Sequence, residues 1–127
     1  MLKKMNRQGI KVNNTTHLDL DLLQGYIDNL GKAVVEQMLQ LYINQSAIYL
    51  DDICGNVSDD KQKLWQESCH KMKGAAGSVG LLLVHKKLVA IEKSEESESA
   101  KQAHLVELDE INTQANKEYS EWLSKAY

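Results

Sequence analysis

The chain has 127 residues, contains neither proline nor phenylalanine, and carries 15 basic and 18 acidic side chains, which gives a formal net charge of −3. This length supports one domain with a hydrophobic core, and the small, mixed charge argues against nucleic acid as the main partner. No run of 18 apolar residues occurs and the basic start lacks the apolar centre of a signal peptide, so we expect no direct membrane contact. The two cysteines, Cys54 and Cys69, lack metal-ligand spacing and fit a reducing, cytoplasmic compartment.

Five amphipathic segments follow a polar start, residues 1–16, which is expected to be a tail or linker. The first predicted helix lies within residues 16–31, with Thr16 or Asp19 as its N-cap and Gly31 at its end. The others are predicted at about 32–54, 60–79, 81–93 and from 100 onward, joined by polar or glycine-containing runs. Short links between amphipathic helices favour antiparallel neighbours. Residues 17–127 are therefore predicted to form an all-α domain, an antiparallel up-down four-helix bundle with an additional short N-terminal helix.

The second predicted helix has the broadest apolar stripe. Residues three and four positions apart share one face of a helix, and this face collects Val35, Leu39, Tyr42, Ser46, Tyr49 and Ile53. Four more apolar residues, Val34, Met38, Leu41 and Ile48, widen the stripe. We expect them to join the core as well.

The third predicted helix is unusual because Gly74 and Gly77 lie close to His70 in the run CHKMKGAAGSVG, residues 69–80. Glycine inside a helix costs about 0.5–1 kcal/mol relative to alanine. On a helical wheel, the face expected to be buried collects Leu64, Trp65, Cys69, Met72, Ala75, Ala76 and Val79. The face expected to meet solvent collects Lys63, Gln66, Glu67, His70, Lys73, Gly74 and Gly77.

The two glycines thus leave the surface beside His70 without side chains, which suits a site against which a large partner presses. A neutral imidazole is nucleophilic near pH 7, and Lys73, one turn away, can offset the charge of a phosphate. The pattern therefore predicts that this face accepts an anionic group, a phosphoryl group, from another macromolecule.

The same run resembles the signature of histidine phosphotransfer (HPt) domains, and the matching places are filled by His70, Met72, Lys73, Gly74, Ala75, Ala76, Val79 and Gly80. The run LDLDLLQGYIDNLG resembles the first helix of the family, and Ile91-Glu92 is similar to an apolar–Glu pair that such domains often carry. The resemblance covers about residues 17–125. The run KGAAGSVGL is most similar to the C-terminal HPt domains of hybrid sensor histidine kinases of the ArcB and TorS kind.

The resemblance implies a role in a bacterial-type two-component phosphorelay. Nε2 of His70 would take a phosphoryl group from an aspartate on the receiver domain of a hybrid sensor kinase and pass it to an aspartate of a response regulator. Lys73 would steady the phosphoryl oxygens and Gln66 would hydrogen-bond nearby. The residues expected to meet the receiver are Gly74, Gly77, Glu67 and Lys63.

The resemblance also implies what the chain does not need. Magnesium would belong to the receiver domain, so no cofactor or metal is expected in this chain. A carrier that presents one face to successive partners is expected to be a monomer. We expect it in the cytoplasm, either alone or as the cytoplasmic C-terminal domain of a membrane-anchored kinase.

Two function classes remain open, a phosphoryl carrier and a non-transferring helical adaptor that docks a receiver domain. An adaptor has no need for a histidine at position 70. The chain has no glycine-rich phosphate loop and no kinase nucleotide motif, so we expect no autonomous kinase activity. His17, His85 and His104 lie in separate segments without ligand spacing, so they predict no metal site.

Overall fold

The computed structural model describes residues 16–126, so the predicted tail falls outside this range except for its last residue. The elements of this part of the chain are α1 (Leu20–Leu30), α2 (Lys32–Cys54), the short 3₁₀ helix η2 (Asp59–Lys61), α3 (Gln62–Ser78), α4 (Leu82–Glu92) and α5 (Glu98–Lys125). The predicted all-α fold is confirmed. Within residues 16–126, no helix combines the length and the apolar character that a membrane span requires.

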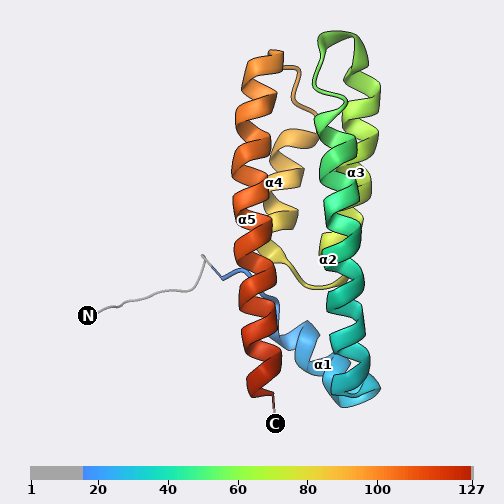
Figure 1. Ribbon diagram of the computed structural model, residues 1–127, viewed down its shortest axis with the longest axis vertical. Helices are drawn as coiled ribbons and strands as arrows, with labels where there is room; N and C mark the ends of the chain where they lie inside the picture. The colour runs from blue at the N-terminus through green and yellow to red at the C-terminus, as the bar shows by residue number, and fades with distance from the viewer. Residues whose placement is uncertain (1–15, 127) are drawn as a thin grey trace, which may run out of the picture.

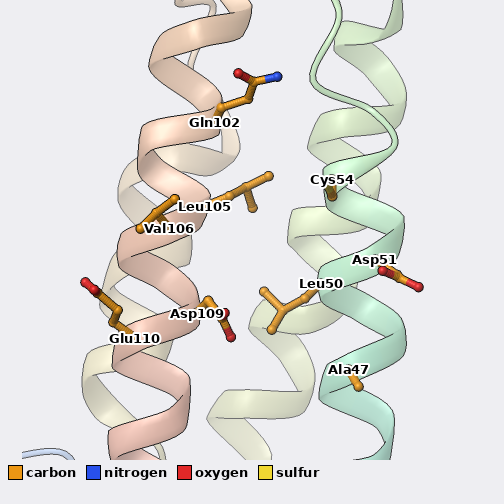
Figure 2. Close-up of a pocket in the computed structure, with 9 residues that line it drawn as sticks. All are labelled: Ala47, Leu50, Asp51, Cys54, Gln102, Leu105, Val106, Asp109 and Glu110. Carbon is orange, nitrogen blue, oxygen red and sulfur yellow. The ribbon is translucent and has the colours of Figure 1, made fainter.

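The four helices α2, α3, α4 and α5 stand side by side as an antiparallel bundle (Figure 1). α2 and α5 run along its whole length, whereas α3 and α4 occupy only its upper part, and α1 lies below the turn that joins them. Around the bundle, α2 contacts α3, α3 contacts α4, α4 contacts α5, and α5 contacts α2 again. The face made by α3 and α4 is therefore opposite the face made by α2 and α5, where an open groove runs between the two helices (Figure 2).

A short extended segment before α1 attaches the start of the domain to the turn between α3 and α4. The backbone N–H of Asp19 donates to the carbonyl of Gly80 at 2.9 Å, and the N–H of Leu82 donates to the carbonyl of His17 at 2.8 Å. α1 consequently begins at Leu20, inside the predicted range of residues 16–31. Its N-cap is Asp19 rather than Thr16, and the Asp19 carboxylate accepts from the N–H of Leu22 at 3.2 Å.

The other helices begin within two residues of their predicted starts. α2 has the predicted bounds, Lys32–Cys54. α3 begins at Gln62, slightly later than predicted, because η2 occupies the preceding turn. α5 begins earlier than predicted, at Glu98, because the hydroxyl of Ser97 accepts from the N–H of Ala100 at 3.2 Å and caps the helix.

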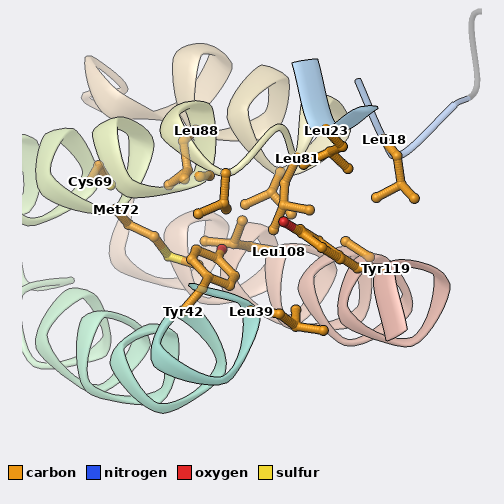
Figure 3. Close-up of a cluster of buried hydrophobic side chains, with 14 of the residues drawn as sticks. Leu18, Leu23, Leu39, Tyr42, Cys69, Met72, Leu81, Leu88, Leu108 and Tyr119 are labelled. Carbon is orange, nitrogen blue, oxygen red and sulfur yellow. The ribbon is translucent and has the colours of Figure 1, made fainter. Parts of the chain in front are cut away.

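Hydrophobic side chains from all five helices form one core (Figure 3). Among those that converge there are Leu23, Leu39, Tyr42, Met72, Leu88, Leu108 and Tyr119. Trp65 is also fully buried, and its indole N–H donates to the carbonyl of Ile91 at 2.9 Å, which ties α3 to α4. The core thus holds α3 and α4 together with both apolar packing and a buried hydrogen bond.

A buried polar network joins α2 to α5. The Tyr42 hydroxyl donates to Oδ1 of Asn112 at 2.7 Å, and Nδ2 of Asn112 donates to the Ser46 hydroxyl at 3.1 Å. Burial, and then the neighbouring Tyr49, raise the pKa of Tyr42, so its hydroxyl stays a donor. These bonds satisfy polar groups whose burial would otherwise be costly.

Four residues predicted to be buried are exposed instead. Val34, Leu41 and Ile48 of α2 are 39%, 61% and 53% exposed, and Leu64 of α3 is 49% exposed. Each helix occupies a corner of the bundle and is covered only on the sides that face its two neighbours and the core. Apolar residues beyond that covered stripe point into solvent, so the stripe predicted for α2 was too wide.

The turn between α3 and α4 depends on Gly80, whose φ of +79° lies in the left-handed region that L side chains avoid. The N–H of Leu81 donates to the carbonyl of Ala76 at 3.0 Å, which ends α3 with a Schellman-type turn. A Cβ at Gly80 would lie 3.3 Å from two atoms of Leu23. The turn therefore requires glycine for its conformation and for its contact with α1.

We expect Gly80→Ala to lower the free energy of unfolding by about 1–2 kcal/mol, because alanine resists the left-handed conformation. Urea unfolding measures this change. The matched control is Gly25→Ala in α1, where an added Cβ meets no atom within 4 Å. This control should gain about 0.5–1 kcal/mol, as alanine does inside a helix. Equal urea midpoints for the two variants would contradict the role assigned to Gly80.

Candidate functional site

His70 lies on the solvent-facing side of α3, next to α4. Its side chain is 68% exposed, in agreement with the helical wheel. Nδ1 lies 3.3 Å from Oε2 of Glu92, at the end of α4. Within residues 16–126, Nε2 has no hydrogen-bond partner. One ring nitrogen is therefore engaged by the protein and the other is available to a partner.

Glu92 contacts both His70 and the predicted cation, Lys73. Its Oε1 lies 2.7 Å from Nζ of Lys73, and its side chain is only 12% exposed. Partial burial alone would raise the pKa of the Glu92 carboxyl, but the hydrogen bond and charge of Lys73, together with His70, lower it below its ordinary value. Glu92 is therefore ionised at neutral pH, where it forms an ion pair with Lys73 and a hydrogen bond with Nδ1 of His70.

The contact with Glu92 favours one tautomer of the imidazole. An ionised carboxylate can accept hydrogen bonds but cannot donate them. The ring nitrogen that faces it, Nδ1, therefore carries the hydrogen. In a neutral ring of this tautomer, Nε2 carries the lone pair. Glu92 thereby orients the imidazole of His70, although the sequence reasoning noted Glu92 only as part of the family resemblance.

The sequence did contain a signal for this contact. His70 and Glu92 are each eleven residues from Leu81, which follows the turn glycine. Residues equally distant from a tight turn between antiparallel helices come side by side. The pairing could therefore have been predicted once the turn was placed at Gly80.

A shallow depression of about 390 Å³ surrounds His70, and its lining residues are Gln66, Glu67, His70, Lys71 and Glu92. The structure thus brings two further predicted residues, Gln66 and Glu67, to His70, and adds Lys71 and Glu92. Lys63 is exposed on the same helix but does not line the depression. The roles of these residues stay predictions.

The two glycines beside His70 differ in their surroundings. A Cβ at Gly74 would meet no atom within 4 Å, so this glycine leaves open surface, as the sequence interpretation holds. A Cβ at Gly77 would lie 3.2 Å from Cδ2 of His85 on α4. The interpretation that Gly77 only clears the outer surface was therefore incomplete, because a side chain there would also press on α4.

Cys69 lies buried below the site, directly beside His70 in sequence. Burial, and then the charge of Glu92, raise the pKa of its thiol to about 12 against the opposing effect of Lys101. The thiol is therefore protonated at neutral pH and serves packing. Among residues 16–126, no group of three or more His, Cys, Asp or Glu side chains is placed to hold a metal ion.

The groove between α2 and α5 is larger, about 740 Å³, but none of the predicted site residues lines it. It lies on the face opposite α3 and α4. The candidate site is assigned to the smaller depression because His70 and Glu92 both line it, and Glu92 also forms the ion pair with Lys73.

Comparison with known proteins defines the class. The family model described as "Hpt domain" matches residues 37–118, more than half of the chain. The chain therefore belongs to the Hpt family, as its resemblance predicted.

Among solved structures, the chain is similar to the histidine-containing phosphotransfer domain of ArcB from Escherichia coli, with a TM-score of 0.76 and 25% sequence identity. The alignment covers 87% of this chain and 95% of that one. No curated protein sequence matches the chain.

Replacing Lys73 by Gln should raise the pKa of the Glu92 carboxyl, because burial then acts without its main compensating charge. An NMR titration that follows the Glu92 carboxyl carbon measures this change. A lowered pKa in the folded state adds stability above the unfolded pKa of about 4.3, and this stability is lost as the pH falls through the folded value. Lys73→Gln should therefore also reduce the loss of stability on acidification.

The control for this titration is Lys71→Gln. Lys71 is exposed and lines the depression without an ion pair to Glu92. The Lys71→Gln substitution should leave the Glu92 pKa near the wild-type value. A Glu92 pKa that responds equally to both substitutions would mean that the general positive charge of α3, and not the Lys73 contact, lowers the pKa of this carboxyl.

Proposed function

We propose that this domain carries a phosphoryl group on Nε2 of His70 between the aspartates of two receiver domains. The contact between His70 and Glu92 carries the proposal, because it leaves an exposed imidazole with its outward nitrogen free. Membership of the Hpt family supports phosphotransfer as the function. The family consists of phosphoryl carriers, so kinase activity is not proposed for this chain.

In the accepting step, the lone pair of Nε2 attacks the phosphorus of an aspartyl phosphate. A P–N bond forms while the bond between phosphorus and the carboxylate oxygen breaks, and the aspartate leaves as a free carboxylate. The ring gains positive charge, which the Glu92 carboxylate stabilises through Nδ1–H. Transfer to a second receiver is the same step in reverse, so the partners set the direction of the relay.

Neighbouring residues would assist at the phosphoryl group. Lys73, held beside His70 by Glu92, supplies a positive charge where the phosphoryl oxygens arrive, and Gln66 supplies an amide at the edge of the depression. Gly74 leaves room for the loops of a receiver. Glu67, Lys63 and Gly77 would meet the receiver around this centre. Mg²⁺ would be held by the receiver domain.

The proposed donor is the receiver domain of a hybrid sensor kinase, and the proposed acceptor is a response regulator. Membership of the Hpt family supports receiver domains as the partners. We place the relay in the cytoplasm, with this domain acting as a monomer that presents the α3–α4 face to each partner in turn.

His70→Gln should abolish phosphoryl acceptance and leave the fold intact, because the ring is mostly exposed and its one hydrogen-bond contact within residues 16–126 is with Glu92. Incubation with a phosphorylated receiver and Mg²⁺ tests this. Label on the wild type should be acid-labile and base-stable, and the variant should carry none. Circular dichroism and urea unfolding check the fold. A wild type that binds receivers but never takes up label would instead be a docking adaptor.

Gly74→Leu should slow phosphoryl transfer about tenfold or more, equivalent to ~1.4 kcal/mol of transition-state stabilisation. The leucine enters open space, so it obstructs an approaching receiver without disturbing the core. Single-turnover transfer kinetics measure the effect. Ser120→Leu, at an exposed position of α5, is the matched control and should transfer at the wild-type rate. Unchanged kinetics in Gly74→Leu would contradict the steric role of the glycine.

A further inference from the structure

The groove between α2 and α5 has an apolar floor. Ala47 and Leu50 line it from α2, and Leu105 and Val106 line it from α5. Leu50 and Leu105 project into the gap from the two facing helices (Figure 2). Val106 is 61% exposed. A concave apolar surface that remains open to solvent is typical of an interaction site.

The rim of the groove is acidic. Asp51 of α2 and Asp109 and Glu110 of α5 line it, and no Lys, Arg or His is among the described residues that do so. None of the ion pairs formed within residues 16–126 involves these three carboxylates. Three uncompensated negative charges therefore surround an apolar floor, which favours a partner of opposite charge.

The length of the groove fits a short helix. Its lining residues extend from Ala47 to Cys54 on α2 and from Gln102 to Glu110 on α5. At about 1.5 Å per residue this is roughly 10–12 Å, or two helical turns. A helix laid between α2 and α5 would place apolar residues at intervals of three and four on the floor and basic residues against the rim.

We propose that the α2–α5 groove binds a basic amphipathic helix of a partner protein. A second copy of this chain fits the groove less well, because it would bring the same acidic rim against itself. The groove lies on the face opposite His70, so the helix and a receiver domain can be bound at the same time. The proposal does not depend on the function proposed for His70.

The test uses the full chain and a fluorescein-labelled 15-residue peptide made of Leu and Lys with leucines at helical spacing. We expect saturable binding by fluorescence anisotropy that weakens with added salt. A peptide of Leu and Glu in the same pattern should not bind. Amide shifts in ¹⁵N spectra should centre on Leu50, Leu105 and Val106 and should spare His70 and Gly74.

Val106→Asp separates groove binding from general attraction between charges. It removes an apolar contact and adds a negative charge, so we expect at least about tenfold weaker binding of the Leu/Lys peptide, a change of ~1.4 kcal/mol. The matched control is Val89→Asp on α4, where the valine is 54% exposed and does not line the groove. This control should bind the peptide as tightly as the wild type.

Several results would overturn the proposal. One is that the Leu/Lys peptide fails to bind, and another is that Val106→Asp binds it as tightly as the wild type or more tightly. Shifts centred on the α3–α4 face would equally exclude the groove. Concentration-dependent loss of the groove signals, together with a dimer in sedimentation, would assign the groove to a second copy of the chain.

Discussion

The carboxylate of Glu92, on α4, contacts His70 and Lys73 of α3 and so joins the two helices into one site. It lies 3.3 Å from Nδ1 of His70 and 2.7 Å from Nζ of Lys73, so one side chain orients the imidazole and holds the cation. This contact exists only because the two helices are antiparallel and in a fixed register. The register in turn depends on the left-handed conformation of Gly80 and on the buried bond from the Trp65 indole to α4.

Much of this structure follows from local rules that a single sequence contains. Helix ends at Gly31 and Gly80, the long uninterrupted α2, and the exposure of His70 all come from caps, glycines and periodicity. The family also follows from one run of residues, because the HPt signature combines a nucleophile, a cation and small residues on one helix face. These features involve neighbours in the chain, where spacing alone fixes geometry.

Features that depend on how helices meet were harder to predict. Val34, Leu41 and Ile48 follow a helical spacing as regular as that of the core residues, and only the positions of α3 and α5 decide that they are exposed. The contact of Gly77 with His85 and the bridging role of Glu92 likewise join two helices. A wheel drawn for one helix contains no information about its neighbour, so these errors share one physical cause.

The attachment of residues 17–19 to the α3–α4 turn gives the domain a mechanical asymmetry. The backbone bonds from Asp19 to Gly80 and from Leu82 to His17 join the chain before α1 to the loop that sets the register of His70 and Glu92. Tension applied ahead of residue 17 therefore reaches that loop through two hydrogen bonds. Tension applied after α5 acts on a helix that carries none of the candidate catalytic groups. Force applied at the two ends of the domain therefore reaches His70 unequally.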